Sequence, residues 1–183
     1  MEVDESDLLT PPVSARDHKQ GPDNAPVTLV EFGDYECPHC GRAYPIIQEV
    51  QRLLGDKLLF VFRNFPITTS HPHAQHAAEA AEAAGAQGKF WEMHDVLYEN
   101  QHALSDSDLL EYARTIGLDL GRFTADMRVH KYAQRVRDDF RSGILSGVNG
   151  TPTFFINEVR YDGPWDVRSL TSALRAASES PAR

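Results

Sequence analysis

Cysteine is scarce in this chain, which has only two in 183 residues. Two cysteines cannot form the several disulfides that stabilise small secreted domains, so a disulfide-rich scaffold is excluded. Both cysteines lie in one short segment, Cys37-Pro-His-Cys40. They are therefore a redox-active pair, half of a metal site, or two core residues without chemistry of their own.

Long apolar runs and an excess of positive charge are also missing. No stretch approaches the about 18 consecutive apolar residues that a membrane-spanning helix needs, so no membrane insertion is expected. Lys plus Arg number 18 against 27 Asp plus Glu, which gives a formal net charge of −9. This balance argues against nucleic-acid partners and against binding to an anionic membrane surface.

The first residues lack the features of a secretory signal, which begins with basic residues and continues through an apolar stretch. They read Met1-Glu-Val-Asp-Glu-Ser-Asp and are acidic. We expect a cytoplasmic protein if the chain is complete as written, and an exported one if the chain is a mature fragment. Residues 1–25 are polar and interrupted by prolines, which predicts an extended or mobile N-terminal arm.

Strand and helix patterns alternate around the two cysteines. Residues 27–32 form an apolar, β-branched run that predicts a buried strand. Apolar positions then recur at helical spacing as far as Leu54, and Pro38 suits the first turn of this helix. Residues 57–62 predict a second strand. Strand, helix and strand in this order predict a parallel βαβ unit whose helix begins at the cysteine pair.

Helical patterns occupy residues 67–147, beginning with an alanine-rich stretch of the surface type. Strand patterns return at residues 150–161, and residues 166–177 predict a last amphipathic helix. We therefore expect an α/β fold. One domain comprises residues 26–66 and 148–177, and residues 67–147 form an inserted helical subdomain.

Placing Cys37 at the start of a helix has a chemical consequence. The free amides and the positive end of the helix dipole stabilise a thiolate there. A thiolate exists only in the reduced pair, so its stabilisation makes the disulfide a stronger oxidant, and His39 adds to this effect. We expect Cys37 to be the exposed attacking thiol and Cys40 the shielded resolving thiol, with exchange through a mixed disulfide at Cys37.

Two further positions are candidates for the same site. Glu31 interrupts an apolar strand six positions before Cys37, and a carboxyl buried there could carry a proton to or from Cys40. Alternatively, Glu31 is hydrated at the end of the sheet. Thr151-Pro152 precedes an apolar strand. A cis bond there would present the Thr151 backbone to an extended peptide substrate.

Two other classes of function fit parts of the sequence. Cys37 and Cys40 together with His73 and His76, which cluster with His71, would supply the four ligands of a zinc site. However, more than 30 residues separate the two pairs, and solvated histidines are common on surface helices. A peptide-binding module with purely structural cysteines is the other hypothesis. The redox hypothesis itself requires no metal and no cofactor.

The segment Val-Glu-Phe-Gly-Asp-Tyr-Glu-Cys-Pro-His-Cys, a helical insertion, and then Gly-Val-Asn-Gly-Thr-Pro-Thr-Phe-Phe-Ile-Asn together resemble the DsbA family of thioredoxin-fold thiol–disulfide oxidoreductases. The resemblance runs from about residue 26 to 177. It implies a thioredoxin-like fold with an inserted helical subdomain, Cys37 as nucleophile and Cys40 as resolving thiol. It also implies Pro152 as a cis-proline facing the cysteines and Glu31 as the buried acid.

The function we expect is disulfide exchange with protein or peptide thiols, with the chain acting as an oxidant and recharged by an unidentified redox partner. Pro38 and His39 complete the active motif. A thiol reductase or a disulfide isomerase is the alternative within the same fold. Known family members are exported whereas this chain shows no signal, and Thr151 is a position at which oxidases and isomerases differ.

Overall fold

The computed structural model describes residues 3–179, which divide into two compact units. Of the described residues, 3–33, 42–63 and 141–179 belong to the first, which we call the sheet unit. Residues 34–41 and 64–140 belong to the second, the helical unit. The segment that contains both cysteines is thus part of the helical unit.

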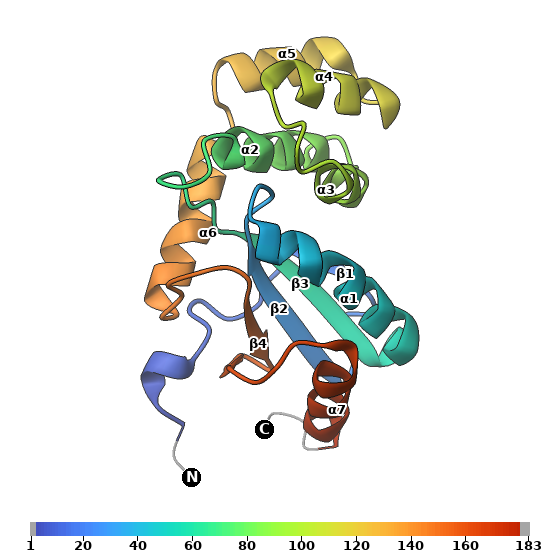
Figure 1. Cartoon of the computed structure of the whole chain (residues 1–183), viewed down its shortest axis with the longest axis vertical. Helices are drawn as coiled ribbons and strands as arrows, with labels where there is room; N and C mark the ends of the chain where they lie inside the picture. The colour runs from blue at the N-terminus through green and yellow to red at the C-terminus, as the bar shows by residue number, and fades with distance from the viewer. Residues whose placement is uncertain (1–2, 180–183) are drawn as a thin grey trace. The chain divides into compact units, whose positions relative to one another are not determined.

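A five-stranded sheet forms the centre of the sheet unit (Figure 1). The spatial order is β1-β3-β2-β4-β5, with β1 and β3, β2 and β4, and β4 and β5 pairing antiparallel. β2 and β3 are neighbours joined through helix α1, as the predicted strand–helix–strand order requires. The strands are His18–Gln20, Val27–Gly33, Leu58–Asn64, Thr153–Ile156 and Val159–Tyr161, and α1 is Pro38–Leu54.

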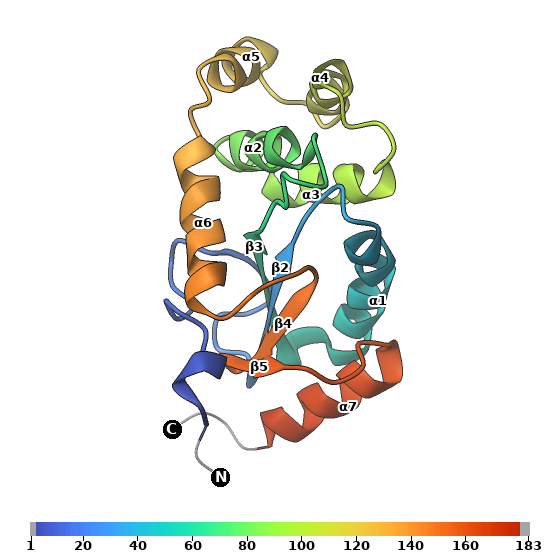
Figure 2. The same cartoon turned by 60° about the vertical axis from the view of Figure 1, so that its left-hand side comes forward.

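The central strands are buried on both faces, which explains their continuous apolar runs. β2 pairs with β4 so that Val30 lies opposite Phe155 and Glu31 opposite Phe154. Glu31 is only 2% exposed, so the alternative of a hydrated carboxyl at the sheet end is wrong. Helix α7, Val167–Ser178, packs against β2, and Figure 2 shows it on the same side of the sheet as α1.

The N-terminal segment, for which the composition predicts an extended or mobile arm, is tied to the sheet. Its strand β1 pairs with β3, and Leu9 is buried. Arg63 makes two hydrogen bonds to the carboxylate of Asp17, at 2.8 and 3.0 Å, and both side chains are at least 95% buried. The same guanidinium donates to the carbonyl oxygens of Pro11 and Pro12. Buried Leu9 and the four hydrogen bonds of Arg63 therefore hold the N-terminal segment in place, although its composition is polar on average.

Helix α2, Ala74–Gly85, is the centre of the helical unit and contacts three of its neighbours. Nine of its twelve residues are buried, so the prediction of a surface helix is wrong. Alanine allows helices to approach closely on every side, and its moderate hydrophobicity gives no amphipathic pattern from which such burial could be inferred. The surrounding helices are α3, Phe90–Glu99; α4, Asp106–Thr115; α5, Leu120–Arg128; and α6, Ala133–Leu145, whose last residues belong to the sheet unit.

None of the helices within residues 3–179 combines the length and the apolar character needed to cross a membrane.

Candidate active site

The two cysteines lie in the first turn of α1. The helix begins at Pro38, so Cys37 occupies the N-cap position, as predicted. The carbonyl of Cys37 accepts the Gly41 amide at 3.0 Å, which is the first hydrogen bond of the helix. The Cys37 amide donates to the carbonyl of Asp34 at 3.1 Å. Both cysteines lie where the amides of the first helical turn favour a thiolate.

Burial of the pair differs from the expectation. Cys37 is 3% exposed and Cys40 is fully buried, so the prediction of an exposed Cys37 is wrong for this structure. The exposed part of the motif is instead Pro38 and His39. A residue at the N-cap turns its side chain back over the end of the helix, whereas the next two positions project outward.

The loop before the motif is organised by Asp34, a residue that the sequence analysis did not single out. Its side chain is buried, and Oδ1 accepts the Glu36 amide at 2.8 Å. Oδ2 accepts the Ile67 amide at 2.8 Å and lies 2.7 Å from Nδ1 of His71. This one carboxylate therefore joins the loop that precedes the cysteines to the segment that follows β3.

His71 is placed to act on the charge of Cys37. Its burial alone would lower the pKa of the imidazole, but the hydrogen bond and charge of Asp34, with smaller contributions from Cys37 and Glu36, raise that pKa above its ordinary value. The attraction between an imidazolium and a thiolate is mutual. Protonated His71 therefore stabilises the thiolate of Cys37, in addition to the helix N-terminus. The sequence suggested His71 only as a member of a histidine cluster.

Gln101, in the segment after α3, holds the backbone of the motif. Its Nε2 donates to the carbonyl oxygens of Tyr35 at 3.0 Å and of Cys37 at 2.8 Å. A side chain at Gly41 would overlap the amide at the end of the Gln101 side chain, which would have to move aside. The hydroxyl of Tyr35 lies 2.9 Å from Nδ1 of His94. Long-range contacts thus fix the first turn of α1, and no local motif indicates them.

The remaining predicted site residues lie in the sheet unit. Glu31 is buried in β2, and Thr151 and Pro152 immediately precede β4. The peptide bond between Thr151 and Pro152 is cis. The structure therefore brings Cys37, Pro38, His39 and Cys40 together in one turn, while the roles of Glu31, Thr151 and Pro152 stay predictions.

The alternative zinc site is not formed. Nδ1 of His73 lies 2.8 Å from Glu36, and Nδ1 of His76 lies 2.9 Å from Asp106. Within residues 3–179, the group whose side chains could jointly hold a metal ion is His76, Glu79 and His130, and it includes neither cysteine.

The chain matches the protein family described as Thioredoxin over residues 14–176. It is 50% identical over 171 residues to the Na(+)/H(+) antiporter NhaA 1 of Mycobacterium sp. (strain KMS), covering 92% of this chain and 28% of that protein. It is 47% identical over 176 residues to the Na(+)/H(+) antiporter NhaA 3 of Salinispora tropica, covering 95% of this chain and 26% of that protein. The chain thus spans 26–28% of the length of these two relatives.

Solved structures resemble the chain along nearly its whole length. A thioredoxin-like oxidoreductase from Silicibacter pomeroyi DSS-3 superposes with a TM-score of 0.80 at 27% identity, covering 97% of this chain and 99% of that one. Oxidised BdbD from Bacillus subtilis gives a TM-score of 0.80 at 23% identity, covering 94% of this chain and 99% of that one.

Proposed function

We propose that this chain, which belongs to the thioredoxin family, exchanges disulfides with protein or peptide thiols through Cys37 and Cys40. The expected thioredoxin-like fold and the resemblance to DsbA-like oxidoreductases are confirmed by the family match and the structural likenesses. The observation that carries the proposal is a dithiol in the first turn of a helix, with Cys37 at its N-cap and its thiolate within the electrostatic influence of His71.

The exchange proceeds in two steps that balance in electrons and protons. A substrate thiolate attacks Sγ of Cys37 in the oxidised pair, a mixed disulfide forms, and Cys40 leaves as a thiolate that takes up a proton. A second substrate thiolate then attacks the substrate sulfur of the mixed disulfide and releases Cys37 as a thiolate. The substrate gains a disulfide, and the pair gains two electrons. Cys37 is the leaving group of the second step, which His71 and the helix N-terminus assist by stabilising its charge.

We further propose that the chain acts as an oxidant. Stabilisation of the Cys37 thiolate favours the reduced pair, and a disulfide whose reduced form is favoured is the stronger oxidant. His39, exposed between the cysteines, contributes to the same preference. A reductase or isomerase is the competing hypothesis, and the reduction potential against glutathione separates the two. An oxidant gives a value less negative than about −200 mV, and a reductase a value near about −270 mV.

The residues that we propose bind the substrate backbone and carry a proton lie in the sheet unit. The backbone of Thr151, which precedes Pro152 next to β4, would pair with an extended substrate, and Glu31 would carry the proton of Cys40. The antiporter names belong to relatives of which the chain covers 26–28%, and the proposal concerns the matched region alone. The redox partner that restores the disulfide is a protein or small-molecule oxidant of unknown identity.

The test is oxidation of a reduced dithiol peptide and reduction of insulin by the purified chain. We expect Cys37→Ser to abolish both activities and Cys40→Ser to accumulate mixed disulfides with the peptide. Leu53→Ser, at an exposed position of the same helix, is the matched control and should leave activity unchanged. Full activity of Cys37→Ser would overturn the proposal.

The contribution of His39 is tested separately. His39→Gly should make the potential of the pair more negative, because one source of thiolate stabilisation is removed. An unchanged potential would show that His39 has no part in setting the oxidising strength.

A further inference from the structure

A second group of ligand-type side chains lies elsewhere in the helical unit. His76 and Glu79 belong to α2, and His130 lies between α5 and α6. One ligand atom from each of the three lies within 4.8 Å of the others. We propose that these residues bind a divalent transition-metal ion of the zinc class, with one coordination position open to the adjoining cavity.

The carboxylate of Glu79 is held in place by neighbouring side chains. Glu79 follows His76 by three positions, so both residues occupy one face of α2. Glu79 is 1% exposed, and its Oε2 accepts a hydrogen bond from Gln75 at 3.2 Å. Oε1 lies 2.9 Å from Nδ1 of His130. A buried carboxylate is costly unless it is paired, and a cation between it and the two imidazoles would supply the charge.

His130 adopts an unusual backbone conformation that brings it to this group. Its φ is 50°, in the left-handed region that residues other than glycine rarely occupy. The ring lies next to that of His76, with centroids 5.5 Å apart, and its Nδ1 faces Glu79. Backbone strain of this kind is concentrated at functional sites, where the surrounding structure maintains it for a purpose.

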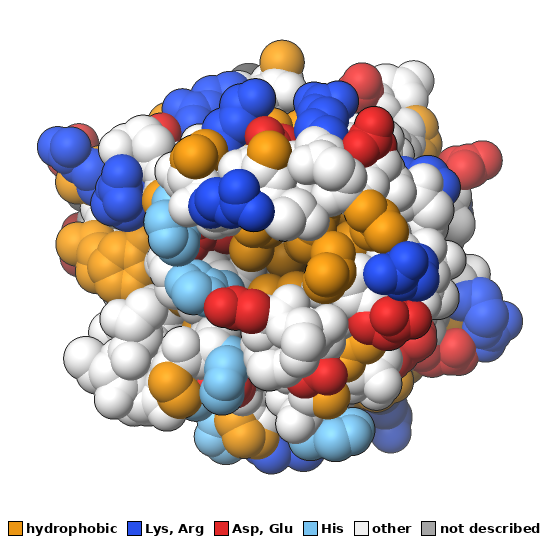
Figure 3. All heavy atoms as spheres, turned by 90° about the horizontal axis from the view of Figure 1, so that it is seen from above, with side chains coloured by type: hydrophobic (Ala, Val, Ile, Leu, Met, Phe, Trp, Pro, Cys, Tyr) orange, Lys and Arg blue, Asp and Glu red, His pale blue; other side chains and the backbone are white. Residues whose placement is uncertain are grey.

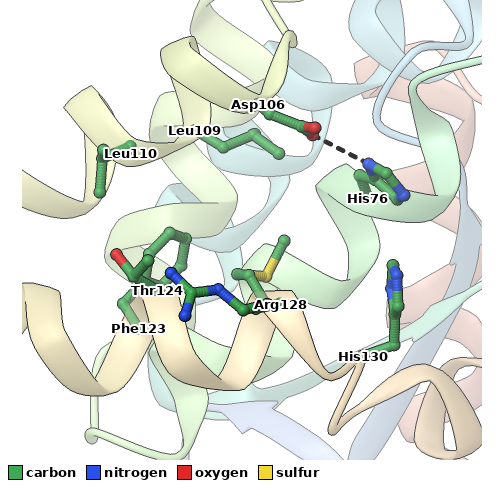
Figure 4. Close-up of a pocket in the computed structure, with 9 residues that line it drawn as sticks. His76, Asp106, Leu109, Leu110, Phe123, Thr124, Arg128 and His130 are labelled. Atoms are coloured by element: carbon green, nitrogen blue, oxygen red, sulfur yellow. Dashed lines mark hydrogen bonds and ion pairs between the residues drawn. The ribbon is translucent and has the colours of Figure 1, made fainter.

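Asp106 supplies the outer support that metal-binding histidines usually have. Its Oδ1 lies 2.9 Å from Nδ1 of His76, as the dashed line in Figure 4 marks. A carboxylate that accepts the Nδ1 proton holds the ring in one tautomer and leaves Nε2 to bind the ion. Asp106 is therefore a positioning residue, not a ligand.

The distances require only small adjustments on binding. Bonds of about 2.0 Å in a tetrahedral site place the ligand atoms about 3.3 Å apart. The 2.9 Å pair of His130 and Glu79 would open slightly as an ion replaces the proton between them. The side chains of His76 and Asp106 are 43% and 79% exposed, so this pair has room to shift toward them together. Two imidazoles and one carboxylate suit zinc better than calcium or magnesium, which prefer oxygen ligands throughout.

The open position faces a cavity of about 310 Å³ lined by both histidines. Leu109, Phe123 and Met127, from α4 and α5, provide apolar walls. Figure 3 shows histidine side chains gathered beside an apolar hollow, and Figure 4 shows the lining residues converging on it. A tetrahedral ion with three protein ligands would therefore carry water in the fourth position, or the anionic group of a small apolar ligand.

The test is titration of the purified chain with zinc chloride by isothermal calorimetry. The Cys37–Cys40 pair is kept oxidised so that thiolates do not bind the metal. We expect one zinc ion per chain, with His76→Gln and His130→Asn each weakening binding by more than about tenfold and Asp106→Asn by about tenfold. Asparagine is chosen at residue 130 because it tolerates the left-handed conformation.

His73→Gln is the matched control, because His73 begins the same helix and is likewise held by a carboxylate, Glu36, but lies outside the group. It should bind zinc like the unaltered chain. Zinc should also raise the thermal unfolding midpoint of the unaltered chain and of His73→Gln, and raise it less in His76→Gln and His130→Asn. Absence of zinc binding by the oxidised chain, or an equal loss in His73→Gln, would overturn the proposal.

Discussion

Oδ2 of Asp34 lies 2.7 Å from Nδ1 of His71, although 37 positions separate the two residues in the chain. The same oxygen accepts the amide of Ile67, which fixes the carboxylate from a second direction. The imidazole is thereby held in place beside the loop that leads into Cys37. This relationship gives the cysteine an electrostatic partner that its own motif does not contain.

Replacement of His71 by asparagine should reduce the reactivity of Cys37 in mildly acidic solution. The variant loses a positive charge that stabilises the thiolate, so the midpoint of thiolate formation moves to higher pH. We would measure the rate of alkylation of Cys37 by iodoacetamide across the pH range. His102→Asn, at an exposed position of the same unit, is the control and should follow the unaltered chain. Identical profiles for His71→Asn and His102→Asn would contradict the assigned role.

Stability should depend on pH through the same residue. The pKa of His71 is raised on folding, so its contribution to the free energy of unfolding is complete below the unfolded value of about 6.5. That contribution is lost as the pH rises through the folded pKa. Urea denaturation should therefore show the largest difference between the unaltered chain and His71→Asn below about pH 6.5, and a shrinking difference above it. A difference that stays constant with pH would rule out this linkage.

Gly41→Ala should destabilise the chain by about 1–3 kcal/mol, because the new methyl group overlaps the Gln101 amide and displaces it from the carbonyl oxygens of Tyr35 and Cys37. Gln101→Ala alone removes the same hydrogen bonds. In a double-mutant cycle, Gly41→Ala should cost much less when Gln101 is already alanine. Additive effects in chemical denaturation would mean that the two residues are not coupled.

The buried ion pair of Asp17 and Arg63 should contribute more to the free energy of unfolding than the exposed ion pair of Lys19 and Asp23. Asp17→Ala should lower the free energy of unfolding by about 3–5 kcal/mol, because it leaves the buried guanidinium without its carboxylate. Asp23→Ala removes the exposed partner of Lys19 and should cost less than about 1 kcal/mol. Equal losses in thermal or urea unfolding would show that burial of the Asp17 pair does not matter.

The parts predicted successfully from sequence depend on local spacing. An N-cap at Cys37 and a proline in the first helical turn follow from residues within one helix, and the strand–helix–strand order follows from two apolar runs. The resemblance of two motifs added the thioredoxin-like fold. Each of these features is contained in a short window of the chain, where periodicity and capping preferences act.

What the sequence did not reveal depends on residues far apart. Asp34 and Gln101 are polar residues in loops, and only contacts with residues far away in the chain give them a role at the motif. Burial of Cys37 and of α2 follows from the same packing, because neither a small thiol nor an alanine-rich helix has a pattern that distinguishes inside from outside. The metal-competent group likewise joins His76 to His130 across 54 positions.

The double contact of Gln101 with the carbonyl oxygens of Tyr35 and Cys37 has a consequence for protein engineering. If only the tetrapeptide from Cys37 to Cys40 were moved into another scaffold, the thiols would be transferred without the side chains that hold the backbone around them in this conformation. A complete graft would have to include the loop from Asp34 to Gly41, the Gln101 side chain that binds its backbone, and the segment from Ile67 to His71 that binds the Asp34 carboxylate. The smallest transferable redox element of this chain is therefore discontinuous in sequence, and a useful design would copy three separate segments at once.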